Sequence, residues 1–401
     1  MDKTFRCAFL AVCAAAAAGA ASAEDVSVYG IIDTGLQYQH VKSGLPDESA
    51  VDNFGLNSGI STGSRWGIKG SEDLGNGLSV GFVLENGFSS DDGTMLQGSR
   101  LFGREAQVYI EGSLGRLAFG RFGSLASGSG TYAIAGKLSP FGTTWGDYSA
   151  NAPNVMAGFD RYDNMISYRS PSWAGVQLHA QYSFGTDSKK YPEGGVEGKS
   201  SVDRYYALGL TYKNGPLNLV GVVDSTNLSS LKWSGATTGE GTWQGDVDDT
   251  VTATVGGSYD FSVLKLYAGC QYYDNANITT LDGLSITGFP GVGSDDLYQM
   301  EGFGLTVGVD APLWGGKIMA AAAYADASID TMNGGRTAAA TGDIDFQRIN
   351  VSLGYQYNLS KRTSLYGVAS YSWNKYEADQ DAFDDIKPKA VEAALGLVHR
   401  F

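Results

Sequence analysis

The feature that most constrains this chain is an alternation of apolar with polar or small side chains at every second residue. Between residues 348 and 359, every odd position is apolar and every even position is polar or glycine. A period of two is that of a β-strand, whose successive side chains point to opposite faces. The same split occurs over 26–37, 205–212 and 264–272. These segments are predicted strands with one apolar face. In the last of them, Cys270 lies on the apolar face as a small filler rather than a nucleophile.

The carboxyl terminus repeats this pattern. Residues 391–401 read VEAALGLVHRF, with His399 as the one polar interruption of the apolar face. The apolar face carries Val391, Ala393, Leu395, Leu397 and Phe401, and the opposite face carries Glu392, Ala394, Gly396, Val398 and Arg400. A terminal strand frays unless something pairs with it. We expect it to pair with the first strand near Val26, which would leave no strand edge unpaired.

Two kinds of connection separate the predicted strands. Seven are short: 72–77, 112–115, 171–175, 213–216, 260–262, 311–316 and 358–362. Eight are long: 41–59, 88–98, 125–160, 187–200, 227–247, 275–295, 328–343 and 377–387. Fifteen connections join sixteen strands. An even count, with short turns at one end and long polar loops at the other, predicts an all-β fold, a transmembrane antiparallel 16-stranded β-barrel.

The amino terminus predicts export. Residues 1–23 combine Lys3 and Arg6 with an apolar run and a closing Ala-Ser-Ala, as in a cleaved secretory signal peptide. A lipoprotein signal ending at Cys13 is the alternative, although Val12 is large for the position before a lipidated cysteine. The predicted mature chain, 24–401, is one barrel domain and retains only Cys270, so it has no disulfide framework.

Charge narrows the choice of partners. Loss of Asp2, Lys3 and Arg6 with the signal changes the net charge from −15 to −16, which argues against a nucleic-acid partner. A soluble secreted β-protein would also be acidic and rich in Gly and Tyr. Such a protein has to cover its apolar strand faces, and no long helical stretch or fixed repeat is present to do so.

Five motifs carry a family resemblance: 64–75 (SRWGIKGSEDLG), 100–104 (RLFGR), 119–121 (FGR), 161–171 (RYDNMISYRSP) and 399–401 (HRF). In this order they resemble the trimeric porins of betaproteobacterial outer membranes. The resemblance implies a homotrimer in outer-membrane lipid, a third loop folded into each lumen, and passive diffusion of ions and small hydrophilic solutes. It also implies that Phe401 is part of a signal read by the barrel-assembly machinery.

The third loop is predicted to set the constriction. Residues 125–160 form the longest connection, and a loop of that length in a compact fold is usually functional. Folded into a lumen, it would narrow the channel and define selectivity. Its only acids are Asp147 and Asp160. Its tip, 139–142, has no carboxylate, which departs from the acidic tip implied by the resemblance.

Basic residues are predicted to oppose this loop. The alternation places Arg65 and Lys69 toward the lumen, opposite Trp66 and Ile68. By motif, Arg104 and Arg161 match arginines at the constriction of the family, although the alternation groups Arg104 with the apolar Phe102, Ala106 and Val108. Arg121 is predicted to brace the wall or lie at the subunit interface. Guanidinium groups facing few carboxylates would favour anions. Alternatively, each arginine is paired with a wall acid such as Glu72, Asp73 or Glu105.

Other functions remain open. Residues 59–63, GISTG, match the nucleophile-elbow pattern of hydrolases, which needs a strand-to-helix turn and a histidine partner. A substrate-specific channel would use an aromatic track, for which Tyr132, Phe141, Trp145 and Tyr148 are candidates, although these rings could equally anchor the loop. No cofactor or metal is predicted, because no two histidines have ligand spacing. Acids of the outer loops, including Asp379, Asp381, Asp384 and Asp385, could instead bind divalent cations or lipopolysaccharide-bridging ions.

Overall fold

The protein folds into one closed antiparallel barrel. The computed structural model describes residues 26–45, 48–190, 197, 199, 202–228, 232–236, 242–246, 248–277, 298–331, 344–378 and 385–401. The predicted signal peptide, 1–23, lies outside them, as do Asp379, Asp381 and Asp384. The barrel strands are β1 (Ser27–Lys42), β2 (Val51–Ser58), β3 (Arg65–Gly75), β4 (Leu78–Gly87), β5 (Glu105–Gly112), β6 (Gly115–Gly123), β7 (Arg161–Arg169), β8 (Val176–Ser183), β9 (Arg204–Asn214), β10 (Leu217–Asn227), β13 (Thr250–Asp260), β14 (Lys265–Asn277), β15 (Tyr298–Leu313), β16 (Gly316–Thr331), β17 (Ile344–Asn358), β18 (Thr363–Ala378) and β19 (Lys389–Arg400).

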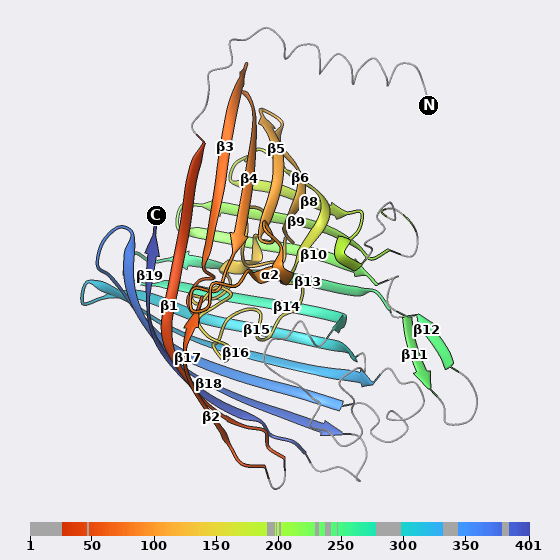
Figure 1. Ribbon diagram of the computed structural model, residues 1–401, viewed down its shortest axis with the longest axis vertical. Coiled ribbons are helices and arrows are strands. Elements are labelled where there is room, and N and C mark those ends of the chain that lie inside the picture. Colours follow the sequence, from red (N-terminus) through yellow and green to blue (C-terminus); the bar gives the residue numbers. More distant parts are fainter. Residues whose placement is uncertain are drawn as a thin grey trace.

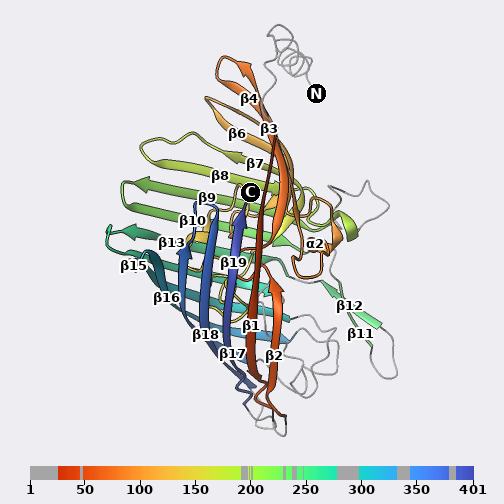
Figure 2. The same cartoon turned by 60° about the vertical axis from the view of Figure 1, so that its left-hand side comes forward.

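The first and last strands close the barrel, as predicted. β1 pairs with β19 in continuous antiparallel register, from Ile31 opposite Arg400 to Lys42 opposite Lys389. Figure 2 shows β1 lying between β19 and β2. Closure leaves no strand edge exposed, which a sheet surrounded by lipid requires.

The prediction of a long loop over 41–59 was partly wrong. Residues 51–58 form β2, which pairs with the carboxyl-terminal half of β1, whereas β3 pairs with its amino-terminal half. β2 and β3 therefore share one position in the wall, and residues 59–64 form a break between them. The sheet has seventeen strands. Because β2 and β3 occupy one position, the barrel has sixteen strand positions, as predicted.

The loops also hold short elements. A separate hairpin, β11 (Lys232–Ala236) with β12 (Thr242–Asp246), lies within the predicted long connection 227–247. The short helix α2 (Leu96–Ser99) and the 3-10 turns η1 (Ala135–Lys137) and η2 (Ser188–Lys190) complete the described elements. No described helix is long and apolar enough to cross a membrane.

The two faces of the wall differ as the alternation predicted. In β19, Val391, Leu395 and Leu397 are exposed outward, whereas Glu392 and Ala394 are buried on the lumen side. Figure 1 shows the barrel with its short turns toward the upper left. An apolar outer wall and a polar lumen are the arrangement of an outer-membrane barrel.

The connection between β6 and β7 folds into the lumen, as expected for 125–160. In Figure 1 its trace runs inside the barrel, behind the strands of the near wall. Many of its apolar side chains are almost completely buried, including Leu125, Ala135, Leu138, Phe141, Val155 and Met156. They pack against the wall and give the barrel an internal core, so the lumen narrows at the level of this loop.

Candidate functional site

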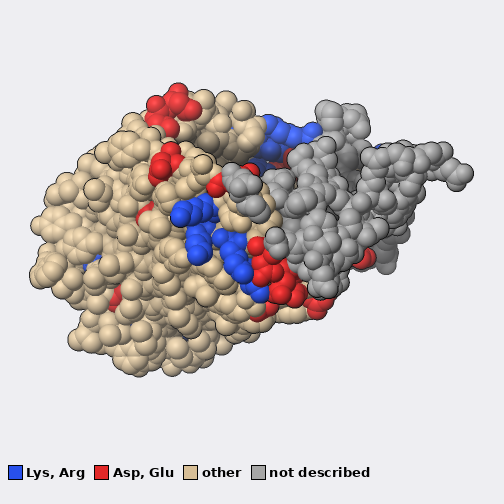
Figure 3. Space-filling model, turned by 90° about the horizontal axis from the view of Figure 1, so that it is seen from below, with Lys and Arg blue, Asp and Glu red and all other residues tan. Residues whose placement is uncertain are grey.

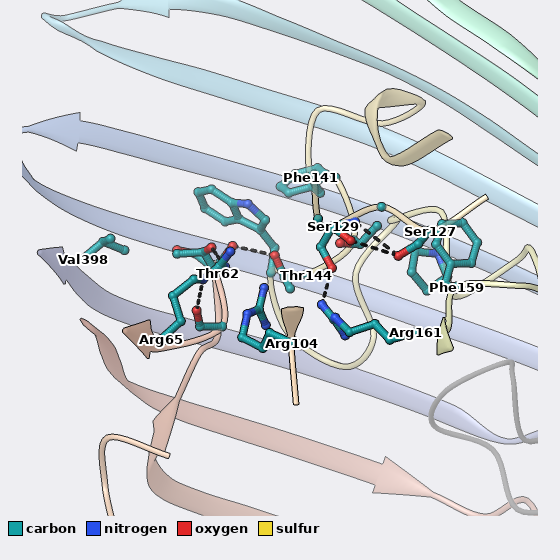
Figure 4. Close-up of a pocket in the computed structure, with 18 of the residues that line it drawn as sticks. Thr62, Arg65, Arg104, Ser127, Ser129, Phe141, Thr144, Phe159, Arg161 and Val398 are labelled. Carbon is teal, nitrogen blue, oxygen red and sulfur yellow. Dashed lines mark hydrogen bonds between the residues drawn. The ribbon is translucent and has the colours of Figure 1, made fainter. Parts of the chain in front are cut away.

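A polar cavity of about 690 Å³ lies between the inner loop and one side of the wall. The loop contributes serine, threonine and glycine positions at 127–130 and 142–144, together with Phe141, Phe159 and Asp160. The wall contributes Arg65, Arg104, Arg161 and Arg400. Figure 4 shows the first three of these arginines in a row below the loop. The cavity therefore brings four arginines of the wall together beside the inner loop.

Arg65 reaches the cavity because it is the first residue of β3, immediately after the break at 59–64. Its Nε donates to the carbonyl of Gly63 at 2.8 Å, and its Nη2 donates to Oγ1 of Thr62 at 2.9 Å. No carboxylate among the described residues lies within ion-pair distance of this guanidinium. Both contacts are neutral, so no carboxylate is bonded to the Arg65 guanidinium, and Glu85 acts on it only from a longer distance.

Arg104 also lines the cavity, but it is paired. It precedes β5 rather than lying in it, so the alternation that grouped Arg104 with Phe102 and Val108 does not apply. Its Nε donates to Oε1 of Glu85 at 2.6 Å, and only 6% of the residue is exposed. The hydroxyl of Tyr29 donates to the other oxygen of Glu85 at 3.0 Å. Arg104 is therefore paired with a wall acid, as the alternative expected, but the partner is Glu85 and not Glu72, Asp73 or Glu105.

Arg161 opens β7 at the far end of the row. Its Nη2 donates to Oγ of Ser129 at 2.5 Å, which connects the wall to the loop (Figure 4). Its Nε is buried without a hydrogen-bond partner. In the part of the chain that the structure describes, no acid forms an ion pair with Arg161, although Asp160 lines the same cavity.

The remaining predicted charges lie in different places. Lys69 is on the lumen face of β3, about 13 Å along the strand from Arg65, and it does not line the cavity. Its Nζ lies 5.2 Å from the ring centre of Tyr29. Asp160 lines the cavity, whereas Asp147 lines a smaller pocket on the other side of the loop and accepts a hydrogen bond from Gln39 at 2.6 Å.

Arg121 lies outside the cavity. Regular alternation along β6 places Phe122 inward with Ala118, and Arg121 on the opposite face with Phe119. Its Nη1 donates to Asp163 at 2.6 Å and its Nε donates to the carbonyl of Gly103 at 2.8 Å. Asp163 is shared with Arg100 at 2.9 Å. These contacts join β6, β7 and the connection before β5, as a wall-bracing role requires.

Arg400 is the cavity residue that sequence reasoning missed. The alternation of the last strand already placed it on the polar face. Membership of the cavity depends on closure, because Arg400 meets the other arginines only when β19 pairs with β1. The alternation thus indicates the lumen face for Arg400, whereas its place in the cavity follows from the pairing of β19 with β1.

The break between β2 and β3 holds the loop from the wall side. Asp33 of β1 is fully buried, and its Oδ2 accepts hydrogen bonds from the backbone amides of Ser61 and Thr62, each at 2.7 Å. The carbonyl of Ile60 in turn accepts from the amides of Trp145 at 2.6 Å and Gly146 at 3.0 Å. A buried carboxylate thus fixes the break, and the break fixes the middle of the loop.

Glu392 of β19 provides a second anchor. This buried carboxylate accepts hydrogen bonds from the loop amides of Asp147 at 3.1 Å and Tyr148 at 3.0 Å. Burial, with Asp147 and Glu392 nearby, raises the pKa of the Tyr148 hydroxyl, so this loop position stays neutral. Farther along, Arg348 donates to the carbonyl of Asn154 at 2.6 Å. The loop is therefore held at several points of the wall.

Most of the candidate aromatic track anchors the loop instead. Tyr132, Phe141 and Trp145 are at most 8% exposed. The ring of Trp145 packs edge-on against Phe141 and against Tyr366 of the wall, with centres 5.7 and 5.4 Å apart. Tyr132 is buried in the internal core, whereas Phe141 and Trp145 pack into that core and also line the arginine cavity with part of their surface.

The nucleophile-elbow match has a structural role. Residues 59–63 lie in the break between two strands, and Oγ of Ser61 donates to Asp33 at 3.0 Å. The three histidines, all described, are bonded elsewhere: His40 to Asp52, His179 to Thr211 and His399 to Thr363. In the described part of the chain, the Ser61 hydroxyl therefore helps to hold the break between β2 and β3 against Asp33 of β1.

A closed barrel with an apolar outer wall, a loop folded into a polar lumen and arginines at the constriction defines an outer-membrane diffusion channel. Residues 10–377 match the family described as Gram-negative porin, and the chain belongs to that family. It is 36% identical to an outer membrane porin protein of Bordetella pertussis over the full length of both chains. It is 28% identical to outer membrane porin protein 32 of Delftia acidovorans, covering 91% of this chain and 89% of that one.

A solved structure agrees with this assignment. The anion-selective porin from Comamonas acidovorans superposes with a TM-score of 0.62 at 25% identity, covering 94% of this chain and 100% of the other. The predictions of a porin barrel and of an outer-membrane location are confirmed.

Proposed function

We propose that this porin is an anion-preferring diffusion channel for ions and small hydrophilic solutes, with Arg65, Arg104 and Arg161 as its selectivity cluster. The observation that carries the proposal is the imbalance of charge in the cavity. Arg65 and Arg161 have no described carboxylate within ion-pair distance, and the loop opposite them offers mainly hydroxyl and glycine positions. The similar porin from Comamonas acidovorans is described as anion-selective, which supports the same preference here.

Uncompensated guanidinium groups at a narrow point act in two ways. They lower the energy of an anion at the step that limits permeation, and they raise that of a cation. Arg104 contributes less because Glu85 neutralises much of its charge. Asp160 is the one loop acid in the cavity and reduces the preference, whereas Lys69 adds positive potential in the vestibule toward the short turns. The net charge of −15 does not oppose this selectivity, because the narrowest point governs it.

The test is the zero-current potential of the purified protein in a planar bilayer across a potassium chloride gradient. An anion-preferring channel gives stepwise conductance and a reversal potential toward that of chloride. A reversal potential toward that of potassium would contradict the proposed selectivity. Absence of conductance would contradict the diffusion-channel proposal itself.

Solute flux separates a general channel from a substrate-specific one. The small exposed area of Tyr132, Phe141 and Trp145 favours the general channel, because little of each ring is available as a sliding track. Flux through a general channel rises linearly with solute concentration. Saturation at millimolar concentration would favour the substrate-specific alternative, and hydrolysis of an ester or lipid by the purified protein would favour the hydrolase alternative.

We further propose that the channel is a homotrimer in outer-membrane lipid. Met95, Leu96 and Leu101 are exposed on the connection between β4 and β5, beyond the wall, which supports contact with a neighbouring subunit. On the face seen in Figure 3, charged side chains gather in one zone beside a broad area that carries almost none. Arg121 braces the wall near this connection through Asp163.

Two assembly partners follow from the same family assignment. Phe401 ends the outward face of the last strand, where the barrel-assembly machinery would read it, and outer-loop acids such as Asp385 would meet lipopolysaccharide through divalent ions. Truncation of Phe401 should reduce insertion without loss of export. Removal of divalent cations should weaken lipopolysaccharide retention without dissociating the barrel. Unchanged insertion or unchanged retention would contradict the respective partner.

A further inference from the structure

The last two residues of the chain point to opposite faces of the wall. The ring of Phe401 lies on the outer face over Gly30, where a Cβ atom would overlap it. Its backbone completes the closing ladder, with Gly30 N donating to Phe401 O at 3.1 Å and Phe401 N donating to Gly30 O at 3.0 Å. Arg400 faces the lumen and lines the arginine cavity.

Arg400 lies at the level of Arg65. Both residues pair with Ile31 of β1, Arg400 from β19 and Arg65 from β3. Directly opposed residues in a sheet share a face, so these two side chains flank Ile31 on the lumen side. Closure of the barrel therefore adds a fourth arginine to the row that runs through Arg65 and Arg104 to Arg161.

The charge of Arg400 is not compensated nearby. Its side chain is exposed to the lumen, and among the described residues no carboxylate lies within ion-pair distance of it. The backbone amide of Arg400 donates a hydrogen bond to the carbonyl of Arg362 at 2.8 Å. This contact does not involve the guanidinium, and the side chain lines the cavity. In this respect Arg400 resembles Arg65 and Arg161 rather than Arg104.

We propose that Arg400 is a further selectivity-determining residue, placed at the end of the arginine row next to the short turns. The proposal rests on the proposed anion-preferring function and assigns separate roles to the final dipeptide: Phe401 closes and seals the outer wall, and Arg400 acts on permeating anions.

The experiment compares zero-current potentials of the wild type, Arg400→Gln and Arg400→Glu in the same potassium chloride gradient. Removal of one charge that lines the cavity should lower the anion-to-cation permeability ratio by about twofold to fivefold. The charge reversal should lower it further, and Arg400→Lys should restore most of it. Arg362→Gln is the matched control, because Arg362 carries the same charge on the exposed turn after β17 and does not line the cavity.

A cysteine variant tests the location without relying on selectivity. In a Cys270→Ser background, which removes the one cysteine of the predicted mature chain, Arg400→Cys should react with a negatively charged thiosulfonate and lose conductance for chloride. Faster reaction from the short-turn side is expected.

The outcomes separate the two proposals. If Arg161→Gln lowers the permeability ratio but neither the Gln nor the Glu variant of Arg400 does, and the thiol of the Arg400→Cys variant remains unmodified, Arg400 has no selectivity role and the anion channel stands. If the wild type itself prefers cations, the proposed function is wrong. Arg400→Gln could fail to assemble while Arg400→Lys assembles and conducts normally. In that case the thiol reaction of the Arg400→Cys variant decides the question, and absence of the reaction overturns the proposal.

Discussion

Arg65 and Arg400 flank the same residue, Ile31, although they lie at opposite ends of the sequence. The closing seam of the barrel is therefore also part of the wall of the constriction. The same seam carries Asp33 and Glu392, the two buried carboxylates that hold the break and the inner loop. Errors in closure would change the constriction directly, which links assembly of this barrel to its permeability.

Loss of an uncompensated guanidinium should weaken anion preference. We expect Arg161→Gln and Arg65→Gln each to lower the anion-to-cation permeability ratio by about twofold or more, because each removes one unit charge at the narrow point. The measurement is the zero-current potential in a salt gradient. Lys361→Gln, on an exposed turn, is the control. Equal shifts in all three variants would indicate a general charge effect and contradict a local cluster.

Loss of the acid beside Arg104 should have the opposite effect. Glu85→Gln removes the negative charge that neutralises Arg104 and retains an oxygen for the Tyr29 hydroxyl. We expect a higher anion-to-cation permeability ratio together with a lower unfolding temperature, since the buried guanidinium loses its ionic partner. Zero-current potential and thermal unfolding test the two effects. An unchanged ratio would show that Arg104 does not act on the permeating ion.

The two loop acids should differ. Asp160→Asn is expected to raise anion preference because Asp160 lines the arginine cavity, whereas Asp147→Asn should change it little because Asp147 faces the other side of the loop. The pair is internally controlled, since each variant removes one carboxylate from the same loop. A larger effect of Asp147→Asn would mean that ions also pass through the smaller pocket.

Sequence patterns predicted the wall much better than the constriction. The alternation and the short turns depend on local residues, so the sixteen strand positions and the lumen-facing sides of Arg65 and Lys69 could be deduced. The break at 59–64 could not, because it depends on Asp33, a residue of another strand, accepting the amides of Ser61 and Thr62. The place of Arg400 in the cavity also depends on contacts between distant residues, because it requires closure of the barrel. The separation of Asp147 from Asp160 likewise depends on the path of the loop.

Removal of the Glu392 anchor should loosen the inner loop. Glu392→Ala leaves the amides of Asp147 and Tyr148 without their acceptor. These amides are partly buried, and a fully buried amide left unpaired costs about 1–3 kcal/mol, so we expect more open-channel noise and a lower unfolding temperature. Glu392→Gln, which keeps one acceptor oxygen, should fall between the alanine variant and the wild type. Single-channel recordings as quiet as those of the wild type would contradict an anchoring role.

The seat of Phe401 on Gly30 should be required for closure. A larger side chain at position 30 would overlap the ring and displace the last residue from the ladder with β1. Gly30→Val should therefore lower the yield of folded barrel and the temperature at which the barrel unfolds. Both are measured by electrophoresis of unheated and heated samples, in which the folded and unfolded forms migrate differently. Gly221→Val is the matched control, because Gly221 lies inside β10 and a Cβ there meets no neighbouring atom within 4 Å. Gly30→Val combined with Phe401→Leu, a smaller apolar end residue, should recover part of the loss. Failure of both glycine variants to the same degree would show that strand propensity, rather than the contact with Phe401, limits closure.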